Sequence, residues 1–352
     1  MKKIGIGVIG CGFIAQTAHL PNYLNNPHVK ILAVADVVSA KLNQVKEKYD
    51  VDAYSDYKEL LKRPDIEAVS ICAPTNLHVG IATEAAELGK HILVEKPIAL
   101  SLAEADQIIS TAQKNRVKLM VGYNYRFLPN HQLAIRFVKQ GRIGKPYFVR
   151  GQFASAGPYQ NLEEAKKTHY LNPAAGGGAL FDSGTHLIDL LLWMFGDVKQ
   201  VAANMGTYME GVQVEDVATV ILQFKNGVLG EVNVTWVNLP DYFAMRNSNV
   251  IEIIGSEGKV ESDFFGPSLS FYSKHSRICK LKGTVKLTPK PLDPKIPFFA
   301  LQFSQNKTID SFIDCILHDS VPLVPGEEAR KVLQVTLSAF ESFRTGNFIQ
   351  LP

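Results

Sequence analysis

The stretch IGIGVIGCGFIAQ, residues 4–16, contains two overlapping glycine patterns of the kind that bind the phosphates of a dinucleotide. A motif beginning at Gly5 would have only four residues before it, so no strand could precede it. A motif beginning at Gly10 follows a complete apolar strand, 4–9, and opens a helix at Phe13. The second frame is therefore the phosphate turn. It predicts that the cofactor is bordered by Gly10, Gly12, Phe13 and Ile14.

An acidic residue is expected about 20 positions beyond such a motif, where it holds the adenine ribose. Asp36 ends the apolar segment VKILAVAD, twenty-one positions after Ala15. Its carboxylate would accept hydrogen bonds from both ribose hydroxyls and would repel a 2′-phosphate. The next two residues, Val37 and Val38, supply no arginine to receive that phosphate. NAD is therefore favoured over NADP.

Residues 1–123 alternate apolar strands with amphipathic helices, which predicts a parallel, doubly wound sheet of the Rossmann type. Such sheets bind ligands at the carboxyl ends of their strands. The expected strands are 4–9, 29–35, 51–54, 68–72, 91–94 and 118–122, and the expected helices are 13–24, 39–48, 57–61, 78–88 and 102–115.

After residue 123 the pattern changes, and a second domain is expected over 124–352. A strand is predicted at 146–156, and residues 217–237 read as two strands joined by an Asn226-Gly227 turn. A further strand pair should meet near 255–259. Strands of this kind predict an α+β domain with a large, predominantly antiparallel open sheet.

The composition excludes several classes of function. A net charge of +3 gives no support for a nucleic-acid or membrane partner. The four cysteines form no CxxC pair, which argues against a zinc cluster and favours a reducing, cytoplasmic location. The longest strongly apolar run, 187–195, is too short to span a bilayer. The seven lysines and arginines of 274–295 are interpreted as solvated side chains rather than a site for a phosphorylated sugar.

Three further blocks carry a resemblance to a known family. Glu95-Lys96-Pro97 ends the strand at 91–94 and follows the turn APTNLH, residues 73–78. The second block is GGGALFDSGTHLIDLLLWMFG, residues 176–196, and the third is the tail PGEEARKVLQVTLSAFESFRTGNFIQL, residues 325–351. Together with the N-terminal glycine motif, these blocks resemble the glucose-fructose oxidoreductase / inositol dehydrogenase (Gfo/Idh/MocA) family over nearly the whole chain.

The resemblance implies a catalytic set of Lys96, Asp182 and His186. In the family's sugar and polyol dehydrogenases, the histidine takes the proton of a substrate hydroxyl, the aspartate orients the imidazole, and the lysine bonds the reacting oxygen. Whether Lys96 or His186 takes the proton first stays open. The resemblance also suggests a cis peptide at Lys96-Pro97. It adds Ala73, Thr75, Asn76, His78, Glu95 and Lys96 to the residues expected at the cofactor.

The residues themselves leave alternatives open. Lys96 could be a solvated lysine at a strand end. Asp182, His186 and Asp189 are spaced to share one stripe of an apolar helix, so the polar stripe must be satisfied internally or line a cavity. A core histidine bonded to a carboxylate and a shared metal ion are the other interpretations. No second cluster supplies further ligands, and no metal is predicted.

Residues near the domain crossing and ahead of the glycine block are candidates for substrate binding. The candidates at the crossing could instead form a structural hinge. The candidates in segment 153–172 could instead be ordinary polar residues of a loop. The candidates are Tyr123, Asn124, Arg126, His169 and Tyr170. The resemblance further implies a homodimer or homotetramer that uses the open face of the sheet.

The sequence thus predicts an NAD-dependent dehydrogenase acting on a secondary hydroxyl of a sugar, polyol or sugar derivative. One alternative is a glycosidase or dehydratase-like relative that uses NAD only transiently. Another is a regulator that senses a dinucleotide or a sugar without catalysis.

Overall fold

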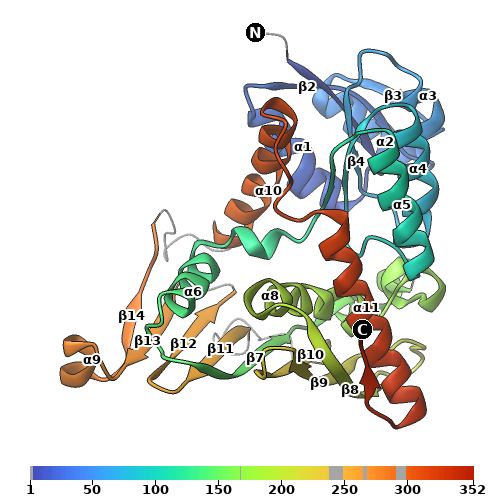
Figure 1. The fold of residues 1–352 in the computed structure, drawn as a ribbon. Coiled ribbons are helices and arrows are strands. Elements are labelled where there is room, and N and C mark those ends of the chain that lie inside the picture. Colours follow the sequence, from blue (N-terminus) through green and yellow to red (C-terminus); the bar gives the residue numbers. More distant parts are fainter. Residues whose placement is uncertain (1–2, 167, 238–248, 265–267, 291–298) are drawn as a thin grey trace. The chain divides into compact units, whose positions relative to one another are not determined.

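The computed structural model describes the chain except for residues 1–2, 167, 238–248, 265–267 and 291–298 (Figure 1). The chain forms two compact units. The first comprises residues 1–124 and 305–333, and the second comprises residues 125–304 and 334–352. Each unit is built around its own sheet.

The first unit contains a six-stranded, fully parallel sheet in the order β3-β2-β1-β4-β5-β6. This is the doubly wound arrangement that the alternation of strands and helices predicts. All six residues of β1 are buried, as expected for a strand covered on both faces. The strands are β1 (Ile4–Ile9), β2 (Val29–Ala35), β3 (Asp52–Tyr54), β4 (Ala68–Ile71), β5 (His91–Val94) and β6 (Leu119–Val121).

The helices between these strands begin and end within one or two residues of their predicted bounds. Ser101 and Glu104 form a reciprocal capping box at the start of α5, and Asp56 caps α3. The helix after β1 begins with a π-helical turn, Ala15–His19. The remaining helices are α1 (Leu20–Asn25), α2 (Ser39–Tyr49), α3 (Tyr57–Leu61), α4 (His78–Glu87) and α5 (Leu102–Lys114).

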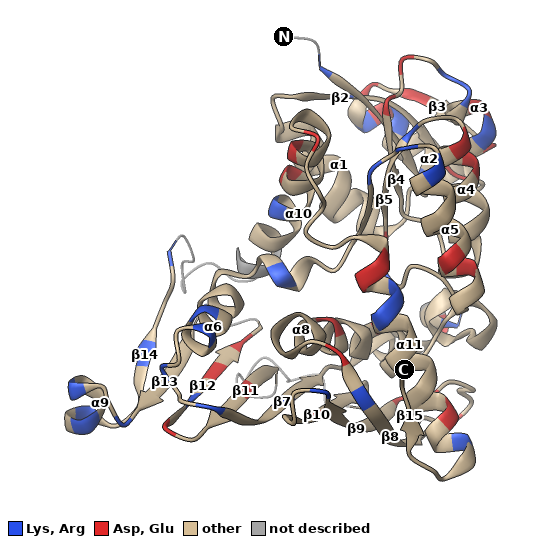
Figure 2. Cartoon of the chain, in the orientation of Figure 1, with Lys and Arg blue, Asp and Glu red and all other residues tan. Residues whose placement is uncertain are grey.

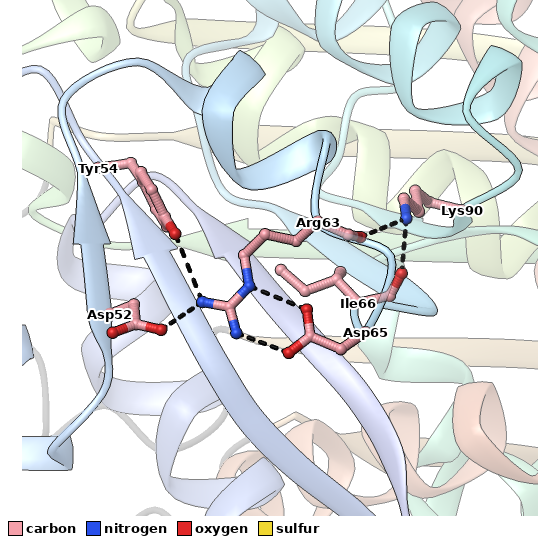
Figure 3. Close-up of polar contacts among 6 residues, drawn as sticks. All are labelled: Asp52, Tyr54, Arg63, Asp65, Ile66 and Lys90. Carbon is pink, nitrogen blue, oxygen red and sulfur yellow. Dashed lines mark hydrogen bonds and ion pairs between the residues drawn. The ribbon is translucent and has the colours of Figure 1, made fainter.

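A group of polar contacts around Arg63 and Lys90 stabilises the edge of this sheet (Figure 3). The Arg63 guanidinium donates to both carboxylate oxygens of Asp65, at 2.9 and 2.7 Å, and also to Asp52 on the edge strand β3. The buried Lys90 ammonium donates to the carbonyl oxygens of Arg63 and Ile66, both at 2.8 Å. These contacts tie the segment between α3 and β4 to the edge strand.

Two C-terminal helices, α10 (Phe299–Leu317) and α11 (Gly326–Thr345), contribute residues 305–333 to the first unit. Asn26, which follows α1, donates to Asp310 on α10 at 3.1 Å. Met120 of β6 forms an isolated bridge with Pro325, just before α11. The Rossmann sheet is thus completed by residues some 200 positions away in the sequence.

The second unit contains a nine-stranded, mixed sheet in the order β14-β13-β12-β11-β7-β10-β9-β8-β15. All neighbouring pairs are antiparallel except β7 and β10. The predicted fold class is confirmed. The strands are β7 (Pro146–Ala154), β8 (Val198–Gly206), β9 (Val217–Phe224), β10 (Leu229–Thr235), β11 (Val250–Gly255), β12 (Gly258–Asp263), β13 (Leu269–Ser273), β14 (Val285–Leu287) and β15 (Ile349–Gln350).

One face of this sheet is covered by α6 (Pro129–Lys139) and α8 (Thr185–Phe195) (Figure 1). α8 packs closely on Gly151 of β7, where a Cβ atom would lie 3.3 Å from the Leu187 side chain, a tight contact. Burial alternates along β9, so Val220 and Leu222 face the helices while Ile221 is 51% exposed. On the opposite face of β9, Ile221 is therefore open to solvent. Two short helices, α7 (Leu162–Ala165) and α9 (Arg277–Lys282), complete the unit.

Acidic and basic residues are interspersed over both units (Figure 2). The basic segment 274–295 contains the short helix α9 and strand β14, while residues 291–295 lie outside the described part of the chain. Lys274 pairs with Glu257 at 3.0 Å on an exposed surface.

Candidate active site

The turn after β1 has the form that the glycine pattern predicts. Gly10 has a φ of +94°, and a Cβ atom there would lie 2.6 Å from the Cys72 carbonyl oxygen. Only glycine fits this position. At Gly12 a Cβ atom would meet no described atom within 4 Å. The turn therefore leaves room in front of a helix N-terminus, which is where the pyrophosphate of a dinucleotide binds.

Asp36 follows β2, and backbone N–H groups hold both of its carboxylate oxygens. The N–H of Cys11 donates to Oδ2 at 2.6 Å, and that of Val38 donates to Oδ1 at 2.7 Å. The carboxylate is thus fixed beside the glycine turn, where NAD-binding domains hold the adenine ribose. Phe13 and Val37 are 77% and 86% exposed, and Ile14 is half-buried. These apolar side chains suit an adenine ring and offer no cation to a 2′-phosphate.

The turn after β4 contains Ala73, Thr75, Asn76 and His78. Thr75 is buried and Asn76 is exposed. The His78 ring lies between two carbonyl oxygens: Nε2 is 2.9 Å from that of Ala73 and Nδ1 is 2.9 Å from that of Pro97. Burial lowers the pKa of His78 despite these two contacts. His78 is 1% exposed. Its two contacts join the turn after β4 to the turn after β5.

The turn after β5 contains Glu95 and Lys96, and the predicted cis peptide at Lys96-Pro97 is confirmed. Glu95 Oε1 accepts a hydrogen bond from His19 Nε2 at 2.8 Å, and Glu95 Oε2 lies 3.3 Å from the Lys96 N–H. Burial acts to raise the pKa of Glu95, but the His19 hydrogen bond and the charges of His19 and Lys96 bring it below its usual value. A Cβ atom on Gly122 would lie 3.1 Å from this carboxylate.

Three residues that the sequence analysis did not single out support Glu95. His19 Nδ1 lies 3.0 Å from Ser70 Oγ, which in turn lies 2.7 Å from the Tyr23 hydroxyl. His19, Ser70 and Tyr23 are each no more than 3% exposed. Their role could have been inferred from polar side chains inside apolar segments, because a buried polar group needs a hydrogen-bond partner. Ser70, for example, interrupts the buried strand AVSI.

In the second unit two residues of the glycine block 176–178, Gly177 and Gly178, have no room for a side chain. A Cβ atom on Gly177 would lie 2.4 Å from the Tyr170 carbonyl oxygen. Gly178 has a φ of +117°, and a Cβ atom there would lie 2.3 Å from the Glu215 carboxylate. The block therefore joins the loop around Tyr170 to Glu215 and leads directly into a π-helical turn, Leu180–Gly184, which continues as α8.

Glu215 caps this helix and was also missed from the sequence. Its Oε1 accepts the Leu180 N–H at 2.9 Å, and its carbonyl oxygen accepts the Ala179 N–H at 2.9 Å. A carboxylate at a helix N-terminus satisfies amides that have no partner within the helix. Burial raises the pKa of Glu215 to about 7, although hydrogen bonds from the backbone act to lower it.

Asp182 and His186 lie at the start of this helix, and both are half-buried. Ser183 Oγ lies 3.2 Å from Asp182 Oδ2. The His186 ring stacks on Tyr125, with centroids 4.4 Å apart and planes inclined by 27°. A π-helical turn is uncommon and is found often at functional sites, and here it carries Asp182.

Asp189, the third member of the predicted stripe, lies in a buried ion pair. It forms a fork with the Arg126 guanidinium, with contacts between 2.6 and 3.1 Å, and both side chains are 1% exposed. Arg126 also lies 5.8 Å from the Trp193 ring centroid. Removing one member of such a buried pair would leave an uncompensated charge, at a cost of about 3–5 kcal/mol. This environment supports the structural alternative for Arg126.

The other candidates for substrate binding are divided between the two units. Tyr123 is buried and Asn124 half-buried, and both belong to the first unit. His169 and Tyr170 are half-buried in the second unit, and their rings lie 4.1 Å apart. Lys96 belongs to the first unit, whereas Asp182 and His186 belong to the second. Among the described residues, no group of three or more histidine, cysteine or acidic side chains could hold a metal ion.

The two units match the two domain models of one family. Residues 4–123 match the oxidoreductase family with an NAD-binding Rossmann fold, and residues 131–261 match the Gfo/Idh/MocA C-terminal domain. The chain therefore belongs to the Gfo/Idh/MocA oxidoreductase family, and the resemblance seen in its motifs is confirmed. It is an NAD-binding oxidoreductase, as the glycine turn and Asp36 predict.

Several similar proteins match three quarters or more of this chain. The chain is 30% identical to an uncharacterized oxidoreductase, YrbE, of Bacillus subtilis over 76% of both chains. It is 28% identical to myo-inositol 2-dehydrogenase of Thermotoga maritima over 98% of both chains. A solved structure of levoglucosan dehydrogenase with NADH and levoglucosan superimposes with a TM-score of 0.88 over 100% of both chains, at 24% identity. At that identity the last comparison shows the shared fold.

Asp36→Ala should weaken the binding of NAD more than that of NADP. The substitution removes a charged acceptor for the ribose hydroxyls, which is worth about 1.5–3 kcal/mol, or a factor of about 10 to 100 in affinity. NADP gains no comparable contact from Asp36, so its affinity should fall less or should rise. Quenching of protein fluorescence on titration with each nucleotide measures both constants, with Glu47→Ala on the exposed face of α2 as the matched control. Equal losses for the two nucleotides would contradict the assignment of Asp36 to the ribose.

Glu215→Gln should remove one pH-dependent contribution to stability. The pKa of Glu215 is about 7 in the folded chain against an ordinary value of 4.5, so the folded state holds this proton more tightly. The contribution is fully present below pH 4.5 and is lost as the pH rises through 7. The free energy of unfolding of the wild type, relative to Glu215→Gln, should therefore fall by up to about 3 kcal/mol between pH 5 and pH 8. Urea unfolding at both pH values measures the difference, and a constant difference would disprove the raised pKa.

Proposed function

We propose that this chain is a dehydrogenase that oxidises a secondary hydroxyl of a sugar, polyol or sugar derivative with NAD. The observation that carries the proposal is the Glu95-Lys96-Pro97 turn at the carboxyl end of β5, in a domain whose glycine turn and Asp36 are formed for NAD. The substrate class is supported by the relative of Thermotoga maritima, which acts on myo-inositol.

The proposed chemistry assigns a separate task to each side chain. His186 removes the proton of the substrate hydroxyl, and Asp182 orients the imidazole and stabilises its charged form. Lys96 donates a hydrogen bond to the reacting oxygen while negative charge develops there. Bound NAD would supply the acceptor for the hydride of the carbinol carbon. Glu95 holds the backbone of Lys96 through its contact with the Lys96 N–H.

Residues of the glycine turn, Asp36 and the turn after β4 would hold the nucleotide. The amides at the N-terminus of the helix after β1 would bind the pyrophosphate. The two turns joined by His78 would form the edge of the site at the ends of β4 and β5. These residues bind and orient the cofactor, while Lys96, Asp182 and His186 act on the hydroxyl.

Wild-type protein mixed with NAD and a panel of sugars and polyols should produce NADH, which is measured by its absorbance. The panel would include myo-inositol, scyllo-inositol and levoglucosan. Lys96→Ala should lower kcat by a factor of about 10²–10⁴, because it removes a group that assists proton transfer and charge stabilisation. Lys62→Ala, which alters an exposed lysine paired with Glu59, is the matched control.

Two outcomes would favour the alternatives. Turnover of a glycoside without net NADH would indicate a transient use of the cofactor. Binding of NAD and sugar, with no reaction of any kind across sugars and glycosides, would indicate a sensor.

We further infer that the chain self-associates through the face of the nine-stranded sheet opposite α6 and α8. Leu229, Phe148 and Ile254 lie in register across β10, β7 and β11, and Leu229 and Ile254 are 51% and 38% exposed. The neighbouring row places Arg150 between Glu231 and Glu252. An apolar row beside a row of alternating charge is suited to pairing with a second copy of itself.

Light scattering after size exclusion should give a mass that is two or four times 38.9 kDa. Charges introduced on both sides of Phe148 in the apolar row, in Leu229→Asp with Ile254→Asp, should shift the mass to that of one chain. The exposed substitution Leu281→Asp on α9 is the control. An unchanged mass in the double variant would place the interface elsewhere.

The chain is also proposed to act in the cytoplasm. All four cysteines are free, and three of them are buried, which suits a reducing compartment. No helix in the described part of the chain has the length and apolar character needed to cross a bilayer.

A further inference from the structure

Trp236 connects three parts of the second unit that are distant in sequence. It follows β10 directly and is 2% exposed. Its backbone N–H donates to the Asp216 carbonyl oxygen at 2.8 Å, beside the Glu215 cap. Its indole Nε1–H donates to Ser183 Oγ at 3.0 Å, inside the π-helical turn. Its ring packs edge-on against two tyrosines of the loop that precedes the glycine block.

The hydrogen bond between Trp236 and Ser183 can run in only one direction. An indole N–H donates and cannot accept, so Ser183 Oγ must be the acceptor in its contact with Trp236. The Ser183 hydrogen is then left for a second partner, and Asp182 Oδ2 lies 3.2 Å away. An ionised carboxylate only accepts hydrogen bonds. The Trp236 indole therefore fixes the Ser183 hydroxyl as a donor to Asp182.

The second connection joins Trp236 to the segment 157–172. The Tyr159 and Tyr170 rings lie 6.3 and 6.5 Å from the Trp236 ring, at 88° and 85°, which are edge-to-face contacts. Gly157 lies against the indole, where a Cβ atom would be 2.5 Å from the ring, and its φ is +48°. The segment is thus fitted to the indole at both of its ends.

We propose that Trp236 is a positioning residue that couples the segment 157–172 to the orientation of the Asp182 carboxylate through Ser183. This inference rests on the proposed function, because it assigns Asp182 to the reaction and the segment to the substrate. A substrate that contacts Tyr170 would then hold the indole, and the indole would hold the carboxylate that orients His186. Recognition of the correct substrate would raise the rate of the chemical step as well as the occupancy of the site.

The proposal predicts a loss in kcat rather than in KM. Trp236→Phe keeps an aromatic ring against the tyrosines but removes the indole N–H that donates to Ser183. Its kcat should fall by about 10- to 100-fold, as expected when a reacting group is displaced by a fraction of an ångström. The KM for the sugar and the affinity for NAD should each change by less than about threefold, because neither the loop nor the Rossmann unit is altered.

Two further variants separate positioning from a general loss of structure. Ser183→Ala should reproduce the loss in kcat, and the double variant with Trp236→Phe should lose no more than Ser183→Ala alone, since both act through one hydrogen bond. Trp193→Phe makes the same replacement at the only other tryptophan of the chain and should retain wild-type kcat. Additive losses, or an unchanged kcat in Trp236→Phe, would overturn the proposal.

A second readout does not depend on turnover. In Trp193→Phe the only tryptophan is Trp236, so intrinsic fluorescence reports that indole alone. Titration with myo-inositol and with levoglucosan, in the presence of NADH, should give a saturable change in emission for a ligand that orders the segment. A saturable change without NADH production in the dehydrogenase assay would support the coupling while refuting the proposed function. A flat titration with every member of the panel, whether or not turnover is seen, would overturn the coupling.

Discussion

The architecture of the first unit depends on the contact between Gly10 and the carbonyl of Cys72. The Cys72 N–H donates to Ile9 at 2.7 Å and the Gly10 N–H donates to Ala35 at 2.7 Å, so three strands are joined where β1 ends. No side chain fits between Gly10 and Cys72. This close approach lets β1 turn sharply into the next helix, and the helix N-terminus then faces the carboxyl edge of the sheet. The position of Asp36 follows from the same turn, since its carboxylate is held by the N–H of Cys11.

Three buried carboxyl groups, Glu95, Glu215 and Asp189, each have specific hydrogen-bond donors. Glu95 stays ionised through the hydrogen bond from His19, whereas Glu215 depends on helix amides and has a pKa near 7. Asp189 is paired with Arg126 in a fork from which solvent is almost entirely excluded. Isolated charges in such places would cost several kcal/mol, so each carboxylate requires its own donors. These donors come from distant parts of the sequence, which makes the sites sensitive to the fold as a whole.

The sequence was sufficient for most elements of the fold, because periodicity and glycine turns are local signals. The frame at Gly10, the strand-ending Asp36 and the hairpin at Asn226-Gly227 all follow from neighbours along the chain. The role of Asp189 did not follow, since spacing on a helix cannot show that Arg126 lies opposite. His19, Ser70 and Glu215 were missed for the same reason: their partners lie 35 to 76 positions away. That residues 305–333 join the first unit has no local signal at all.

Two networks of hydrogen-bonded side chains, each containing a serine, end on carboxylates: Asp182, a proposed catalytic residue, and Glu95, the neighbour of Lys96. In the second unit the order is Trp236, Ser183 and Asp182. In the first it is Tyr23, Ser70, His19 and Glu95, and the ionised Glu95 requires His19 Nε2 to donate. His19 Nδ1 lies 3.0 Å from Ser70 Oγ, which lies 2.7 Å from the Tyr23 hydroxyl. A serine hydroxyl can accept and donate at once, so in each unit a serine can link a buried aromatic side chain to the groups that hold the carboxylate. Both networks include a π-helical turn, through His19 and through Asp182, in which backbone hydrogen bonds span five residues instead of four. The same physical device therefore fixes a carboxylate in each unit.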